Sequence, residues 1–246
     1  MRDTWQGDTS VHAVNGSHSS REWFCSGRQG RSRLCCLPRR IRVSWRLVGS
    51  ALPVSYDPHA MNAVVLDGFR GSEGQSVLAV LTNALAEAGY ATEVVALREK
   101  TIAPCLGCFG CWIKTPGECV IDDEGRRVAR AAARCDLLVY FTPVTFGGVS
   151  SELKKAVDRL IPNISPFFAR VRGETHHQRR YPRCPSLIGL GTLPQPDREA
   201  ETIFKTLVER NALNFRSPRT AAAVVALDGT SDVAAIARGL VEAVTR

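Results

Sequence analysis

Hydrophobic and polar positions follow a regular order from Met61 to the C-terminus of the sequence. Short apolar segments predict buried strands, and longer segments with apolar residues three and four positions apart predict helices. The helices have clear end signals, with Ser150 as an N-terminal cap and Gly89 as a C-terminal one. The predicted strands are residues 63–67, 91–97, 135–143, 186–191 and 220–227, and the predicted helices are residues 75–89, 123–134, 150–161, 197–212 and 231–245.

This alternation of strands and helices predicts an α/β fold. Nearly continuous apolar strands that alternate with helices are typical of a parallel sheet covered on both faces. Five strands and five helices in about 185 residues suit a three-layer α/β/α, flavodoxin-like doubly wound sheet with strand order 2-1-3-4-5. The basic, proline-containing stretch at residues 162–183 has no predicted element.

Residues 1–60 have a different texture. They hold nine Arg, no Lys and four acidic residues, so this segment carries +5 of the formal charge of +8. A basic arm that contacts nucleic acid or membrane would have this composition, and a transit peptide is a second interpretation. We favour a third, a disordered extension or upstream sequence in front of a working initiator at Met61. The sequence then divides into this extension and one domain at residues 61–246, with no nucleic-acid or membrane partner expected.

Two absences narrow the class of protein. No run of about 18 apolar residues occurs, and the N-terminus lacks the basic start and apolar segment of a secretory signal. A cytoplasmic protein is therefore expected, and disulfides are correspondingly less favoured among the nine cysteines.

The predicted topology selects the loops that face a ligand. Ligands of doubly wound sheets bind beyond the carboxyl ends of the strands, which here means residues 67–76, 142–149 and 191–197. The first loop is glycine-rich and opens a helix, an arrangement that suits a phosphate but is also common in plain turns. The second loop joins Pro143 to the Gly147–Gly148 pair and includes Phe146, which suits a flat aromatic ligand or an ordinary buried connection.

The strongest local signal is a cysteine loop, PCLGCFGCWIKTPGECVIDDE. Its four cysteines, Cys105, Cys108, Cys111 and Cys119, have the spacing C-x2-C-x2-C-x7-C. Four soft thiolate ligands in one compact run can hold an iron–sulfur cluster. A zinc site and an unoccupied, redox-sensitive thiol loop remain alternatives, although zinc sites built from four cysteines more often pair two C-x2-C segments separated by a longer loop.

Other polar residues receive structural interpretations. His176 and His177 are expected to be solvated, and the acidic residues 122–124 are expected to favour a helix start. Asp158 and Arg159 are expected to form a surface or interface pair. No side chain is assigned as a catalytic acid or base.

The cysteine loop, together with FTPVTFGGVSSELKKAVDR, resembles the iron–sulfur flavoproteins and the related NADPH-dependent FMN reductases of the flavodoxin-like superfamily. The resemblance covers residues 61–246 and is most specific over residues 102–160. It implies an FMN phosphate site and an isoalloxazine site, and it implies that the four loop cysteines are ligands of a [4Fe–4S] cluster. The implied phosphate-binding residues are Gly68, Arg70, Gln75 and Ser76, and the implied isoalloxazine-binding residues are Pro143, Val144, Thr145, Phe146, Gly147 and Gly148.

The sequence departs from the family pattern at two of these loops. Asp67 stands where relatives have Gly, and an acid beside a phosphate is unfavourable unless its side chain turns away. Thr145 stands where relatives commonly have an aromatic residue, which shifts the expected ring contact to Phe146.

The resemblance also implies an activity. The implied protein is an NAD(P)H-dependent oxidoreductase. In such a protein FMN accepts electrons, and a cluster passes them one at a time to a small-molecule or protein redox partner. Backbone N–H groups would stabilise the reduced flavin. A homo-oligomer, dimer or tetramer, with FMN near the subunit interfaces is implied as well. A flavin-free protein that uses the cysteine loop as a thiol sensor or zinc site is the alternative from a different class.

Overall fold

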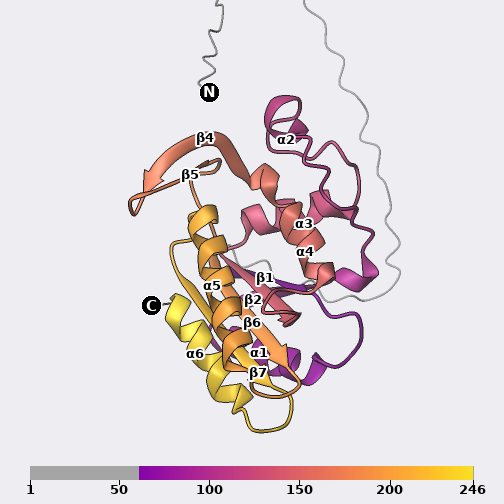
Figure 1. Ribbon diagram of the computed structural model, residues 1–246, viewed down its shortest axis with the longest axis vertical. Helices are drawn as coiled ribbons and strands as arrows, with labels where there is room; N and C mark the ends of the chain where they lie inside the picture. The colour runs from indigo at the N-terminus through magenta and orange to yellow at the C-terminus, as the bar shows by residue number, and fades with distance from the viewer. Residues whose placement is uncertain (1–60, 246) are drawn as a thin grey trace, which may run out of the picture. The chain divides into compact units, whose positions relative to one another are not determined.

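The computed structural model describes residues 61–245, and the expected extension at residues 1–60 lies outside the described residues. A five-stranded parallel sheet forms the centre, in the order β2-β1-β3-β6-β7 (Figure 1). Counted along this sheet alone, the order is the predicted 2-1-3-4-5, so the doubly wound topology is confirmed. The strands are β1 (Met61–Asp67), β2 (Tyr90–Ala96), β3 (Leu137–Pro143), β6 (Ser186–Leu193) and β7 (Thr220–Ala226).

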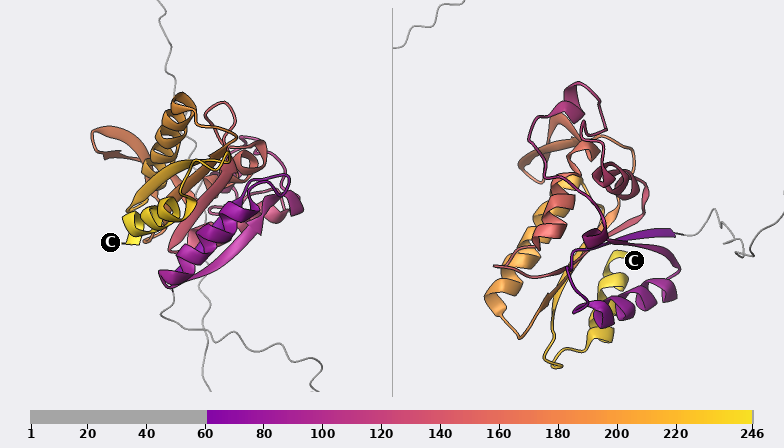
Figure 2. Two further views of the ribbon diagram at one scale, coloured as in Figure 1. Left: turned by 90° about the horizontal axis from the view of Figure 1, so that it is seen from below. Right: turned by 90° about the vertical axis from the view of Figure 1, so that its right-hand side faces the viewer.

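Helices cover both faces of the sheet, which makes the three predicted layers. Two helices, α1 (Gln75–Glu87) and α6 (Val233–Thr245), pack side by side on one face (Figure 2). The other face carries α3 (Glu124–Arg134), α4 (Ser151–Asp158) and α5 (Arg198–Phe215). Each layer encloses its own apolar cluster, and the strands contribute alternate side chains to the two clusters.

The predicted helix ends are confirmed at two positions. The Ser150 side chain accepts a hydrogen bond from the Leu153 N–H at the start of α4. After α1, Gly89 has φ of +84°, a left-handed conformation in which glycine is unstrained.

A two-stranded antiparallel sheet interrupts the expected pattern. Residues 162–183, which had no predicted element, contain the short 3-10 turn Ile161–Asn163 at their start and then the hairpin β4 (Ile164–Val171) and β5 (Glu174–Arg179). The apolar side chains of β4 do not form the long buried run of the central strands, because Phe167 and Phe168 stay 68% and 62% exposed. The hairpin lies outside the central sheet (Figure 1).

The described residues contain no helix that is both long and apolar enough to cross a membrane.

Close packing between the sheet and α5 depends on a glycine. A Cβ atom added at Gly189 of β6 would lie 2.4 Å from Cγ2 of Val208, which is 1% exposed. Native cores lose stability when a methyl group is forced into such a contact.

We expect Gly189→Ala to lower the free energy of unfolding by about 1–3 kcal/mol because of this overlap. Gly239→Ala is the matched control, since a Cβ at that position in α6 meets nothing within 4 Å and a helical alanine should be neutral or stabilising. Urea unfolding of both variants measures the difference. Equal stabilities of the two variants would contradict the close-packing argument.

Candidate functional site

The three loops selected by the topology rule meet at one edge of the sheet. Gly68 N–H donates to the Phe141 carbonyl oxygen over 2.8 Å, and Ser150 Oγ donates to the Gly68 carbonyl oxygen over 2.6 Å. The N–H of Val144, in the second loop, donates to the Thr192 carbonyl oxygen at the end of β6. The carboxyl ends of β1, β3 and β6 are therefore joined by hydrogen bonds, as the doubly wound topology requires.

The first loop leads directly into α1. No side chain caps the first turn of this helix, whose N-cap residue is Gly74. Gln75 and Ser76 are exposed in that turn, where the Gln75 N–H donates to the Ser72 carbonyl oxygen over 3.1 Å and no side chain caps the N–H groups that follow. This arrangement can receive a phosphate at the helix N-terminus.

Gly68 and Arg70 are placed differently from Gln75 and Ser76. Gly68 is buried, and a Cβ there would lie 2.8 Å from both Leu153 Cβ and Ser150 Oγ, so its role is close packing of the loop. Arg70 is 76% exposed and reaches across to α4, where it pairs with Glu152 over 3.0 Å. The ammonium of Lys155 and then the Arg70 guanidinium hold the pKa of the Glu152 carboxyl below its usual range.

Asp67, the departure from the family pattern, is turned away from the loop surface. Its carboxylate is fully buried, pairs with Arg98 over 2.7 Å and accepts the Phe69 N–H over 3.0 Å. The negative charge is thus compensated inside the protein. An anion at the start of α1 would meet helix N–H groups and not a free carboxylate.

The second loop presents an aromatic ring to solvent. Thr145 and Gly148 exchange N–H···O=C hydrogen bonds of 3.0 and 2.9 Å, which closes a turn with Phe146 and Gly147 at its tip. Phe146 has φ of +51° and is 102% exposed. Pro143 and Val144 are half-buried behind this turn. The arrangement offers a flat ligand an open aromatic face rather than an enclosed cavity.

The cysteine loop lies between β2 and α3 and is folded around a single helical turn, α2 (Gly110–Ile113). Cys111 on this turn is 5% exposed, Cys105 and Cys119 are half-buried, and Cys108 is exposed. Burial, followed by the charges of Cys119 and Cys105, raises the pKa of the Cys111 thiol. The four thiols are therefore electrostatic neighbours.

The four thiols of the loop do not form a preorganised metal site. Among residues 61–245, no three His, Cys, Asp or Glu side chains converge closely enough to hold a metal ion as they stand. The donor set nevertheless fits a cluster in its chemistry, because one loop supplies four thiols, and bound iron would relieve the electrostatic repulsion that the other three exert on Cys111.

An aromatic group attaches the cysteine loop to the hairpin. The Trp112 Nε1–H donates to the carbonyl oxygens of Ile161 and Ile164, and its ring stacks on Phe109 and tilts against His177 at centroid distances of 4.9 and 5.0 Å. The expectation of solvated histidines is wrong for His177, which is half-buried and has Nδ1 2.7 Å from the Ser165 carbonyl oxygen. It is wrong for His176 too, whose side chain is 10% exposed and lies 2.8 Å from Glu174.

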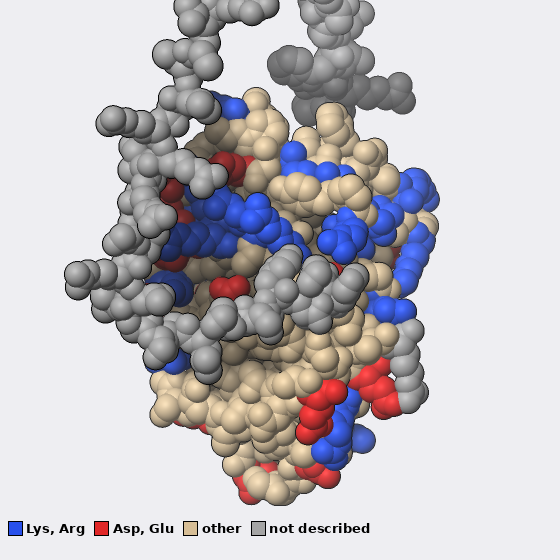
Figure 3. Space-filling model, turned by 180° about the vertical axis from the view of Figure 1, so that it is seen from behind, with Lys and Arg blue, Asp and Glu red and all other residues tan. Residues whose placement is uncertain are grey.

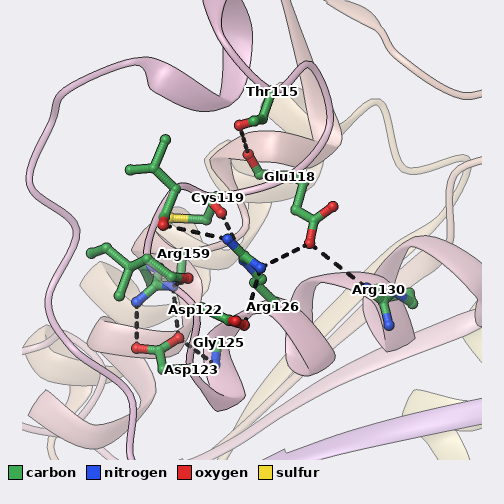
Figure 4. A network of polar contacts seen from close by, with 11 residues as sticks. Thr115, Glu118, Cys119, Asp122, Asp123, Gly125, Arg126, Arg130 and Arg159 are labelled. Atoms are coloured by element: carbon green, nitrogen blue, oxygen red, sulfur yellow. Dashed lines mark hydrogen bonds and ion pairs between the residues drawn. The ribbon is translucent and has the colours of Figure 1, made fainter.

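Two arginines bind the far end of the cysteine loop (Figure 4). Arg126 of α3 donates to the carbonyl oxygens of Cys119 and Val120 and pairs with Glu118 over 3.2 Å. Arg159, at the end of α4, has a fully buried side chain and forms a two-pronged ion pair with Asp123, with distances of 2.7 and 2.8 Å.

The expected surface pair of Asp158 and Arg159 is therefore wrong. Asp158 pairs with Lys154 on the exposed face of α4, whereas Arg159 points inward. The helical spacing carried this signal, since Arg159 follows the buried Ala156 by three positions. The expectation for residues 122–124 is confirmed, because Asp123 caps α3 by accepting the Gly125 N–H over 2.9 Å.

The large grooves lie away from the carboxyl edge of the sheet. One of about 710 Å³ runs from Cys119 along α3 to the amino ends of β1 and β3, and another of about 780 Å³ lies beside the C-terminal end of α5. Lys and Arg side chains gather over the upper half of one face of the molecule (Figure 3). The first groove is lined by Arg126, Arg130, Arg134 and Arg183.

Comparison with known proteins agrees with this fold and loop. The family model described as NADPH-dependent FMN reductase matches residues 61–174. An iron–sulfur flavoprotein of Methanocaldococcus jannaschii is 36% identical over 104 residues, which are 42% of this chain and 53% of that protein. Another from Archaeoglobus fulgidus is 32% identical over 78 residues, 32% of this chain and 34% of the relative. This chain thus spans about half the length, or less, of these two curated relatives.

Solved structures share the fold. An NAD(P)H:quinone oxidoreductase from Methanothermobacter marburgensis superposes with a TM-score of 0.53 and 17% identity, over 75% of this chain and 96% of the other. An azoreductase from Bacillus anthracis superposes with a TM-score of 0.53 and 13% sequence identity, over 75% of this chain and 97% of the other. The domain is thus flavodoxin-like, with a cysteine loop inserted after its second strand. The described domain is thus similar to NADPH-dependent FMN reductases over residues 61–174, and to iron–sulfur flavoproteins over a part of their length.

The Asp123 carboxyl gives the site a measurable pH dependence. Burial would raise the pKa of this carboxyl, but hydrogen bonds from Arg159 and the Ala103 N–H outweigh it and hold the pKa below its ordinary value. Since the folded-state pKa is the lower one, ionised Asp123 stabilises the fold above about pH 4, and this contribution is lost as the pH falls through the folded-state value.

We expect Asp123→Asn to lower the free energy of unfolding by roughly 1–3 kcal/mol at pH 7, because the charged hydrogen bonds to Arg159 are weakened. The difference from the unsubstituted protein should begin to shrink below about pH 4, where the carboxyl of the unfolded chain takes up a proton, and should be lost as the pH falls through the lower folded-state pKa of Asp123. Unfolding by urea between about pH 2.5 and 7 measures it. Asp122→Asn is the control, since that side chain is 85% exposed and should change stability by less than about 0.5 kcal/mol. A pH-independent difference would contradict this account.

Proposed function

We propose that this protein is an FMN-dependent NAD(P)H oxidoreductase whose cysteine loop carries a [4Fe–4S] cluster. The observation that carries the proposal is the presence, in one domain similar to this family, of an open flavin-type edge and a loop of four neighbouring thiols. The relatives named iron–sulfur flavoproteins support it, as does the family description, which names both NADPH and FMN.

In this proposal the chain's own residues bind and orient the flavin. The first turn of α1, with Gln75 and Ser76, receives the phosphate, while Gly68 keeps the loop against α4 and Arg70 supplies a nearby cation. The turn formed by Thr145, Phe146, Gly147 and Gly148, backed by Pro143 and Val144, lies along the isoalloxazine ring.

The cofactors supply the electron chemistry. Bound FMN would supply the capacity to accept a hydride from NAD(P)H, and the thiolates of Cys105, Cys108, Cys111 and Cys119 would hold a cluster that supplies single-electron transfer. The protein contributes positioning and charge, so no side chain is required as an acid or base. A small molecule or a second redox protein is the proposed acceptor, in the cytoplasm.

A second copy of this chain completes the flavin site in our proposal. Phe146 is fully exposed at the tip of its turn, so a bound isoalloxazine ring would retain a solvent-facing side on one chain alone. A dimer or tetramer with FMN near the subunit interface would cover that side.

Removal of the exposed ring tests the flavin part. We expect Phe146→Ala to weaken FMN binding about tenfold, roughly 1.4 kcal/mol, because an aromatic contact with the flavin is lost. Quenching of flavin fluorescence by the apoprotein measures the dissociation constant. Phe167→Ala removes another exposed ring, from β4, and should leave the affinity unchanged. Equal affinities of both variants and the parent would contradict the assignment of the turn.

Metal and sulfide analysis tests the cluster part. Anaerobically purified protein should contain about four iron and four sulfide per chain, and Cys105→Ser should lose most of both while retaining FMN, because one thiolate ligand is missing. Cys184→Ser, which removes a half-buried thiol outside the loop, should keep the full iron content. One zinc per chain, or a metal-free protein with four reactive thiols, would instead support the zinc or thiol-sensor alternative.

A further inference from the structure

The buried guanidinium of Arg159 holds both ends of the cysteine loop. Its Nη1 donates to the Ala103 carbonyl oxygen over 2.8 Å, before the first cysteine, and its Nη2 donates to the Ile121 carbonyl oxygen over 3.2 Å, after the last. Asp123 accepts one further bond from each of these nitrogens. Four of the five N–H donors of the guanidinium are thereby used.

The fifth donor is buried without a partner. The Nε of Arg159 makes no hydrogen bond although the side chain is 0% exposed. A buried N–H without an acceptor costs about 1–3 kcal/mol, so such a group in a folded protein requires an explanation. The Cys119 side chain lies beside this same guanidinium (Figure 4). A thiol is a weak acceptor, whereas a metal-bound thiolate is a good one.

The local chain is shaped to admit this guanidinium. A Cβ added at Gly125, in the first turn of α3, would lie 2.9 Å from Cζ of Arg159, 2.9 Å from Oδ1 of Asp123 and 3.0 Å from Nη2 of Arg159. Alanine is a better helix former than glycine, so a glycine at this helical position is explained by the space it leaves. The space is occupied by the ion pair of Arg159 and Asp123.

We propose that Arg159 is a positioning residue that donates its free Nε–H to the sulfur of Cys119 when this cysteine is a cluster ligand, and so raises the reduction potential of the cluster. The inference rests on the proposed cluster. Both effects of the guanidinium act in one direction, because a hydrogen bond to a ligand sulfur and a nearby positive charge each stabilise the more negative, reduced form.

Three variants separate this role from simple support of the loop. Arg159→Lys keeps a positive charge and removes the Nε–H. Gly125→Ala keeps Arg159 and displaces its guanidinium by the predicted overlap. Asp123→Asn keeps the guanidinium and weakens the ion pair that holds it. Each is purified anaerobically as the full chain, and its iron and sulfide content is measured together with the midpoint potential of the cluster by titration followed by electron paramagnetic resonance.

We expect Arg159→Lys and Gly125→Ala to lower the midpoint potential of the cluster. At a fixed solution potential, the ratio of oxidised to reduced cluster should rise at least tenfold, which corresponds to a fall of about 59 mV for a one-electron couple. Asp123→Asn should leave the potential unchanged or raise it, because a negative charge is removed. If Arg159→Lys fails to fold, Gly125→Ala, which favours the helix, still gives the answer.

Two results would overturn the inference while leaving the proposed function intact. The first is an unchanged midpoint potential in the Arg159 and Gly125 variants, whatever their cluster content. This result would show that Arg159 only supports the structure of the loop. The second is an equal fall in all three variants, which would indicate a loosened loop and not a lost donor. Absence of iron and sulfide from the unsubstituted protein would overturn the cluster proposal itself, and the inference with it.

Discussion

The buried ion pair between Arg159 and Asp123 is the interaction on which the arrangement of the cysteine loop depends. Removing two charges from water is expensive, and such a pair is tolerable only when its geometry is good and its remaining donors are satisfied. Here the pair is two-pronged, and the same guanidinium donates to backbone carbonyls on both sides of the loop. The loop has little regular structure apart from α2, so this polar contact replaces the sheet and helix bonds that fix other segments.

The helix α4 connects the two candidate sites physically. Its first residues, Ser150, Ser151 and Glu152, bond to the loop after β1, and Arg159 follows its last residue and holds the cysteine loop. Eight helical residues span about 12 Å, so the flavin edge and the thiols are held at a short and nearly fixed separation. Its inner side, at Leu153 and Ala156, is fully buried against the sheet, which makes it a rigid strut.

The sequence predicted most of the fold, because the central strands are apolar on both faces and the helices show clear apolar spacing. β3, for example, is buried along nearly its whole length, and its sequence LLVYFTP shows this directly. The hairpin β4–β5 escaped prediction, since its strands are half-exposed and its stability comes from contacts such as that of Trp112 with Ile164. Those contacts join residues 52 positions apart and leave no local pattern.

The candidate sites were predictable to different extents for a similar reason. Strand order alone selects the edge of the sheet where a ligand is expected, and cysteine spacing alone selects the thiol loop. The ion-pair partners of the buried Arg159 and Asp67 were not predictable, because each partner, Asp123 or Arg98, is distant in sequence; helical spacing indicated only that Arg159 lies on the inner side of its helix. Pairs of this kind become visible only when the chain is folded.

Backbone strain gives an independent argument for function at these two places. Four residues other than glycine among those described have positive φ, and two of them, Arg172 and Arg216, lie at the hairpin turn and at the end of α5, where left-handed residues are common.

The other two are Phe109 in the cysteine loop and Phe146 in the turn between β3 and α4, at +52° and +51°. An aromatic residue in this conformation costs about 1 kcal/mol or more. Stacking on Trp112 covers part of the Phe109 ring, which stays 46% exposed, whereas Phe146 is 102% exposed and gains no burial that would offset its strain. A bound group that covers the rings would offset the backbone strain. Phe109 lies beside the thiols of the cysteine loop and Phe146 lies at the carboxyl edge of the sheet, the two places where such a group is proposed.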